Sequence, residues 1–172
     1  MEDNRPVHTV FIGQLCVQTG SCSLAVYGLG SCVALLLCDP EAGVGGLAHV
    51  LLPGEPPPGT ERAGLPAKYG VEAVPSLSRA LVGVGARPAR MRAALVGGAR
   101  LFQGAELLDT GIGARNVERL KALLAEGAVP LALELTGGSQ GRTLRFDLPE
   151  CLLRVRTLRG GWESFGLGRG VA

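Results

Sequence analysis

The sequence lacks several features that would place the protein in familiar classes. None of its apolar runs approaches the length of a membrane-spanning helix, so we expect no insertion into a membrane. No basic segment followed by an apolar one opens the chain, so we expect no secretion signal and a cytoplasmic protein. The 17 basic and 15 acidic side chains nearly balance, and the arginines are scattered, so the charge does not indicate a nucleic-acid partner.

The cysteines lack the spacing of common cysteine sites. Their number is five, which is odd, and no two of them form a Cys-x-x-Cys pair. This pattern argues against a disulfide framework and against a zinc finger, and we expect no metal site. In a reducing compartment a cysteine is usually a small buried apolar residue, and we expect this of four of the five.

The chain has enough hydrophobic residues to form one core. It is 172 residues long, and 47% of its side chains are hydrophobic. We expect a single domain over residues 1–172, with its core in 8–157 and a loosely ordered, glycine-rich tail in 160–172.

The predicted elements are mostly strands. Helical spacing occurs in residues 67–84, where Pro75 predicts a kink or two short helices, and in 113–126, which ends at Gly127. A proline-rich loop is expected at 53–66. Strands are predicted at 9–17, 24–27, 32–38, 44–52, 91–96, 129–135, 143–147 and 151–157. Because no regular βαβ order is present, we expect an α+β fold, a layered sandwich of mixed or antiparallel sheets with two main helical regions.

Residues 28–49 are the stretch on which the functional hypothesis depends. They predict a glycine-rich turn, a strand, a tight turn with Asp39 first and Pro40 second, and a return strand. Residues placed symmetrically about such a turn face each other across the hairpin, which puts Cys32 close to opposite His49. A β-bulge would shift this register by one or two residues.

Cysteine and histidine in this arrangement form a candidate catalytic pair. A nucleophilic thiol needs a partner for its proton, and histidine is the usual one. The glycines before Cys32 allow backbone N–H groups to be exposed, so Gly30 and Ser31 are candidates for oxyanion stabilisation or support. Hairpin geometry alone fits a second interpretation equally well, in which Cys32 and His49 are ordinary buried strand residues.

The stretch is similar to a known family. Residues 28–34, followed by 48–53, resemble the chemoreceptor glutamine deamidases named CheD. The similarity extends over roughly residues 11–155, and it continues in order through Lys68-Tyr69, Gly97-Gly98-Ala99, residues 112–118, Gly137-Gly138 and Gly141-Arg142.

The resemblance implies a fold shared with cysteine-based toxin deamidases and an enzyme of chemotaxis adaptation. Such an enzyme hydrolyses selected receptor glutamine side chains to glutamate and releases ammonia. Cys32 would be the nucleophile and His49 the general base and acid, through a thioester, with no metal or organic cofactor. The implied partners are the cytoplasmic helices of methyl-accepting chemoreceptors and a CheC-type phosphatase.

One departure from the family keeps other functions open. The family's third catalytic position is a threonine six residues before the cysteine, and Val26 stands there in this chain without a hydroxyl. This replacement is compatible with a non-catalytic adaptor of the same fold that binds receptors or a CheC-type phosphatase. A thiol hydrolase of the same fold that acts on another amide is a further alternative.

Overall fold

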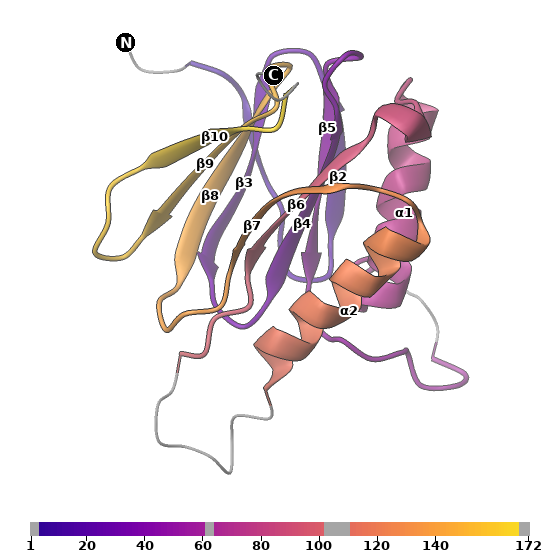
Figure 1. Ribbon diagram of the computed structural model, residues 1–172, viewed down its shortest axis with the longest axis vertical. Helices are drawn as coiled ribbons and strands as arrows, with labels where there is room; N and C mark the ends of the chain where they lie inside the picture. The colour runs from indigo at the N-terminus through magenta and orange to yellow at the C-terminus, as the bar shows by residue number, and fades with distance from the viewer. Residues whose placement is uncertain (1–3, 61–63, 102–110, 169–172) are drawn as a thin grey trace.

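Two five-stranded sheets pack face to face, and the α-helices cover the outer face of one of them (Figure 1). The computed structural model describes residues 4–60, 64–101 and 111–168. The first sheet has the order β1 (Val7–Thr9), β3 (Cys22–Leu29), β8 (Arg142–Leu148), β9 (Leu152–Thr157) and β10 (Glu163–Gly166). The second has the order β2 (Leu15–Thr19), β5 (Val44–Val50), β4 (Val33–Asp39), β6 (Arg92–Gly97) and β7 (Leu131–Thr136). The helices are α1 (Gly70–Gly83) and α2 (Ile112–Glu126), with a 3₁₀ turn, η1 (Pro88–Arg90), before β6.

This arrangement confirms the predicted α+β layered sandwich. Both sheets mix parallel with antiparallel pairs, since β1 runs parallel to β3 and β6 runs parallel to β7. The likeness to toxin deamidases stays a prediction.

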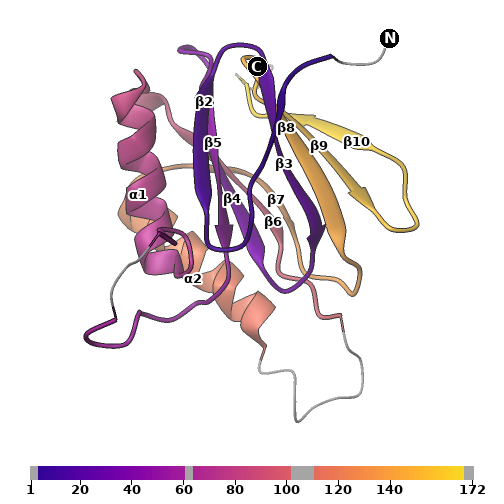
Figure 2. The same cartoon turned by 180° about the vertical axis from the view of Figure 1, so that it is seen from behind.

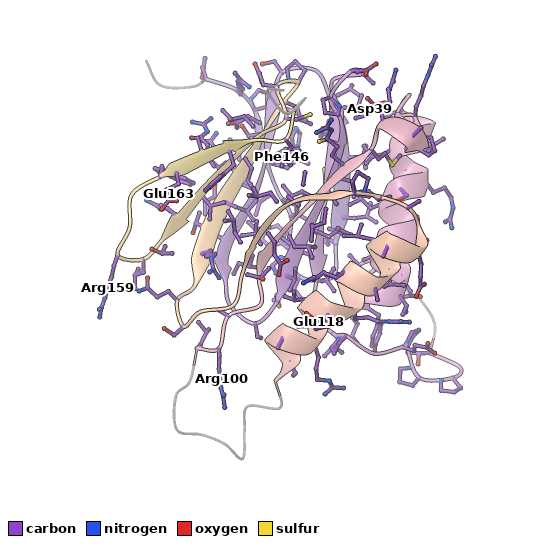
Figure 3. The ribbon with its side chains drawn as sticks, viewed as in Figure 1. Asp39, Arg100, Glu118, Phe146, Arg159 and Glu163 are labelled. Atoms are coloured by element: carbon purple, nitrogen blue, oxygen red, sulfur yellow. The ribbon has the colours of Figure 1, made fainter. Side chains whose placement is uncertain are left out.

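Strand β4 lies at the centre of the second sheet and is buried on both faces. Ala34 and Leu36 face the first sheet, where they belong to the same core as Phe146. Figure 3 shows Phe146 in the layer between the sheets. Val33 and Leu35 face the helices. Because side chains alternate along a strand, one continuous apolar run supplies two separate cores.

The N-terminal segment differs from its predicted structure. The single strand expected over residues 9–17 is two strands, β1 and β2, which belong to different sheets. They are separated by a turn in which Gly13 has a φ of +79°. That left-handed conformation, accessible to glycine at little cost, lets the chain cross from one sheet to the other.

Of the two alternatives predicted at Pro75, the two short helices are wrong, because α1 is one helix, and the kink stays a prediction. Pro75 is exposed, whereas Ala73, Val74, Leu77 and Leu81 are buried against the second sheet. Burial of that face outweighs the one backbone hydrogen bond that proline removes.

Part of the expected loose tail is ordered as well. Residues Glu163–Gly166 form β10, which pairs antiparallel with β9 and completes the first sheet.

The turn between β4 and β5 is fixed by a buried carboxylate. Asp39 is fully buried and accepts hydrogen bonds from the N–H groups of Glu41 (3.1 Å), Ala42 (3.2 Å) and Arg87 (2.8 Å). Its other strong partner is the Arg90 guanidinium at 2.7 Å. Burial alone would raise the pKa of Asp39, but the hydrogen bonds from Arg90, Arg87 and Ala42 outweigh it and hold that pKa below its ordinary value. Asp39 therefore links the hairpin turn to the segment that precedes β6.

Replacing Asp39 with alanine should lower the free energy of unfolding at pH 7 by about 3 kcal/mol, because a half-buried Arg90 would lose its buried partner. The effect should shrink in acid. Since the folded pKa is the lower one, the stability from ionised Asp39 is present above its unfolded pKa and is lost as the pH falls through the folded value. Urea denaturation at several pH values measures both effects. Glu41→Ala is the matched control, because its contact with Arg90 is exposed and should contribute less than about 1 kcal/mol. Equal losses for the two variants would contradict this account.

Candidate active site

The open end of the β4–β5 hairpin carries the predicted site residues, in a register different from the predicted one. The turn comprises residues 40–43, and Gly43 adopts the expected left-handed conformation, with a φ of +65°. His49 therefore pairs with Ala34 and not with Cys32. The expected register is wrong by two positions, because Gly43 belongs to the turn and moves the centre of the hairpin along the chain.

Cys32 and His49 nevertheless lie on the same face of the second sheet. Cys32 belongs to the core between the two sheets together with Ala34, which is the cross-strand partner of His49. Cys32 lies one residue before β4 and diagonal to His49, and diagonal positions on one face of an antiparallel pair are about 7–8 Å apart. Both residues are buried, with exposed fractions of 9% for Cys32 and 6% for His49.

The orientation of His49 is set by main-chain groups. Its Nδ1 lies 3.1 Å from the carbonyl oxygen of Val10. Since a carbonyl only accepts, Nδ1 carries the hydrogen, and Nε2 is left as the basic nitrogen of the neutral ring. The backbone of His49 is held too: its N–H donates to Gln14 and its carbonyl accepts from Gly13, both at 2.9 Å. Figure 2 shows this turn, which joins β1 to β2, beside the end of β5.

Burial lowers the pKa of His49, and the hydrogen bond with Val10 opposes this only in part. The imidazole is therefore neutral at pH 7 and able to accept a proton. The contribution of Val10 was missed by sequence reasoning. No sequence signal marks it, because every residue type supplies a backbone carbonyl.

Val26 has no side-chain donor or acceptor with which to hold the histidine by a hydrogen bond. It is 1% exposed, pairs with Leu144 on β8 and packs in the core between the sheets. The hydroxyl that the family would place at this position is absent, and the Val10 carbonyl supplies an acceptor for His49.

Cys32 is a protonated thiol at rest. Burial raises the pKa of its thiol, and the N–H of its own backbone opposes that shift in part. The residues around it are anchored to the end of β6: Ala99 donates its N–H to Gly30, and Gly98 donates to Cys32, both at 2.9 Å. The roles predicted for Gly30 and Ser31, as oxyanion donors or as support, stay predictions.

Two glycines allow the surrounding elements to approach this closely. Gly97 has a φ of +112°, and a Cβ atom there would collide with the carbonyl oxygen of Cys32. A Cβ atom on Gly113 would lie 2.7 Å from the carbonyl oxygen of Gly98. The first turn of α2 thus rests on the backbone that follows β6.

That placement brings Asn116, a fully buried residue of α2, against the site. Its side-chain amide donates to the carbonyl oxygens of Leu51 at 3.0 Å and Ser31 at 3.5 Å. Sequence reasoning noted Asn116 only as part of the similar segment 112–118 and assigned it no role.

Lys68 and Tyr69 lie beside the residues that follow β5. The Lys68 carbonyl accepts hydrogen bonds from the N–H groups of Leu51 (3.2 Å) and Leu52 (2.9 Å). The Lys68 ammonium lies 5.5 Å from the centre of the Tyr69 ring. These contacts are those of a structural support for the hairpin end that carries His49.

Two kinds of feature are absent from residues 4–60, 64–101 and 111–168. No three His, Cys, Asp or Glu side chains gather there as a metal site. No helix within the same ranges has both the length and the apolar character needed to cross a membrane.

Comparison with known proteins gave consistent matches. A family model described as CheD chemotactic sensory transduction matches residues 51–157. The probable chemoreceptor glutamine deamidase CheD 2 of Geobacter metallireducens is 41% identical over 137 residues, which cover 79% of this chain and 84% of that protein. The probable chemoreceptor glutamine deamidase CheD of Pyrococcus abyssi is 40% identical over 152 residues, covering 88% of this chain and 92% of the relative. The chemoreceptor glutamine deamidase CheD of Thermotoga maritima is 37% identical over 150 residues, with coverages of 87% and 91%.

Restoring the hydroxyl at position 26 should bring no benefit to His49. In Val26→Thr the hydroxyl enters an apolar core, so the free energy of unfolding should fall by about 1–3 kcal/mol. The imidazole should keep its Nδ1–H tautomer, because the Val10 carbonyl already fixes it. Nitrogen-15 NMR of the histidine ring reports the tautomer, and Val26→Ala controls for lost packing. A changed tautomer in Val26→Thr alone would show that position 26 reaches the ring.

Alkylation of Cys32 in the native protein should follow a pH profile displaced upward from that of a free thiol, whose pKa is about 8.5. Burial raises the pKa of Cys32, so little thiolate is present at pH 7. Site-resolved mass spectrometry after short iodoacetamide exposure measures the rate, and the urea-unfolded chain is the control. A native Cys32 that reacts at pH 7 as fast as the unfolded one would contradict a protonated resting thiol.

Proposed function

This chain belongs to the CheD family, and from that premise we propose that it is a chemoreceptor glutamine deamidase with Cys32 as nucleophile and His49 as general base and acid. The relatives' names supply the substrate, a glutamine side chain of a chemoreceptor. The observation that carries the assignment of residues is the hydrogen bond between His49 Nδ1 and the Val10 carbonyl. It leaves Nε2 as a base on the same face of the sheet as the buried thiol.

The chemistry begins from two neutral groups. As the Cys32 sulfur attacks the carboxamide carbon, His49 Nε2 takes the thiol proton. Because burial raises the pKa of Cys32, its side chain is a thiol until the substrate binds. The oxygen of the tetrahedral intermediate becomes an anion, and the N–H groups of Ser31 and Cys32 are the proposed donors to it.

Collapse of the intermediate breaks the carbon–nitrogen bond. His49 gives its proton to the departing ammonia, and a thioester to Cys32 remains. His49 then takes a proton from water as the water attacks the thioester. Glutamate leaves, and the proton returns to the sulfur. The net reaction adds one water to the carboxamide and releases one ammonia, with no metal or organic cofactor.

The alternative of a non-catalytic adaptor rested on Val26. It loses its main support because His49 has an orienting acceptor that does not depend on a hydroxyl. The deamidation experiment below distinguishes the adaptor from the enzyme.

The proposed partners are the cytoplasmic helices of chemoreceptors and a CheC-type phosphatase, and the proposed compartment is the cytoplasm. The receptor partner is supported by the names of the relatives. The phosphatase is supported by the family resemblance alone.

Incubation with the cytoplasmic fragment of a cognate receptor should convert specific glutamines to glutamate, read as the small mass gain in receptor peptides. Cys32→Ala should reduce the rate by about a thousandfold or more, because the nucleophile is gone. His49→Ala should reduce it by about 10²–10⁴-fold, the usual contribution of general acid–base catalysis. Cys16→Ala is the matched control, a half-buried cysteine of β2 outside the pair, and should keep the wild-type rate.

Two results would overturn the proposal. If the wild type binds the receptor fragment but leaves its glutamines unchanged, the chain is an adaptor. If Cys32→Ala deamidates as fast as the wild type, another residue carries the reaction. The acid side of the rate profile is a further check: since burial lowers the pKa of His49, the rate should hold until the pH falls below about 6.5.

A further inference from the structure

The side chain of Asn116 joins two backbone segments at the mouth of the hairpin. The ladder between β4 and β5 ends at the pair Val33 and Val50. Ser31 and Leu51 lie just beyond that pair, and their carbonyl oxygens accept from the same amide of Asn116. The amide thus joins the two chains just beyond the last pair of the ladder. Its acceptors are the residue before Cys32 and the residue two positions after His49.

We propose that Asn116 is a positioning residue, which fixes the Ser31–Cys32 peptide so that the Cys32 N–H points toward the thiol and toward the oxyanion that forms during attack. The C=O and N–H groups of a trans peptide point in opposite directions. A Ser31 carbonyl held toward α2 therefore turns the Cys32 N–H toward the opposite side, and this N–H lowers the pKa of the Cys32 thiol against the effect of burial. The inference rests on the proposed deamidase function and adds to it the residue that sets an oxyanion donor.

The local chemistry of Asn116 favours such a role over a merely structural one. Asparagine is a poor residue for a helix interior. Its Oδ1 is buried and has no hydrogen-bond partner among the described residues, which is destabilising. Rotating the amide to exchange its oxygen and nitrogen would place Oδ1 against two carbonyl oxygens. The orientation is therefore determined, and it satisfies two backbone acceptors while leaving one side-chain acceptor unpaired.

The helix that carries Asn116 is held in place independently. Gly113 lies in the same helix, three residues before Asn116, and packs directly against the carbonyl of Gly98. Val117 and Leu120 are buried against the second sheet. The amide of Asn116 therefore acts from a fixed support, as accurate positioning of a peptide requires.

The test compares Asn116→Ala with Leu124→Ala, a fully packed residue near the far end of α2. For Asn116→Ala we expect kcat for receptor deamidation to fall about 10–100-fold with KM nearly unchanged, since an oxyanion donor acts in the transition state. The pH profile of Cys32 alkylation should also move upward, because the N–H no longer favours the thiolate. Leu124→Ala should lower the melting temperature and leave both measurements as in the wild type.

The outcomes separate the two proposals. Wild-type kcat and an unmoved alkylation profile in Asn116→Ala, with only a lower melting temperature, would overturn the positioning role and leave the deamidase intact. A moved alkylation profile together with a wild type that does not deamidate would overturn the deamidase and keep the positioning of Cys32, since alkylation needs no receptor. If Asn116→Ala does not fold, the same measurements on Asn116→Ser decide. Its shorter hydroxyl donor should give a partial loss in both readouts, and wild-type values in both would overturn the role.

Discussion

The contact between Gly113 and the carbonyl of Gly98 is the constraint on which the candidate site depends. No side-chain atom separates the first turn of α2 from the turn after β6. That approach places Asn116 over the end of the hairpin, and Gly97 meets the carbonyl of Cys32 equally closely. A methyl group at either position would push apart the elements on either side of Cys32. The glycines in this part of the chain thus allow neighbouring backbone segments to approach each other closely.

Much of the fold follows from local patterns in the sequence. The apolar run of β4 and the spacing of α2 were sufficient to predict both elements, because burial dictates their periodicity. Residues 9–17 were predicted wrongly, since nothing local reports that Gly13 sends the chain into a second sheet. Pro75 also misled, because the gain from a buried helix face depends on a sheet formed far away in sequence. The register error at the hairpin came from Gly43, whose place in the turn shifts every cross-strand partner by two.

The side chains of the candidate site could be predicted from the sequence, whereas its main-chain groups could not. Cys32 and His49 were found from residue type and turn symmetry, and they do share a face of the sheet. The Val10 carbonyl was not predictable, since its role depends on the N-terminal turn that wraps His49. Asn116 lay in a recognised segment, but its contacts become evident only when α2 and the hairpin are seen together. In Figure 3, Asp39 lies at the end of the molecule remote from Arg100, the residue that follows the Gly97–Ala99 turn of the site. The turn of the hairpin and its open end, where the candidate site lies, are therefore stabilised by separate interactions.

The Val10 carbonyl bears on how such proteins are sorted by their sequences. A contact made by the main chain survives every substitution at its own position that preserves the local backbone. A survey that classifies active and inactive members by the presence of a hydroxyl at position 26 would therefore discard this chain, although its histidine has an orienting partner. Sorting by the geometry around the imidazole would retain it. In this chain the group that holds the imidazole belongs to the peptide backbone, so an inventory of side chains alone does not contain it.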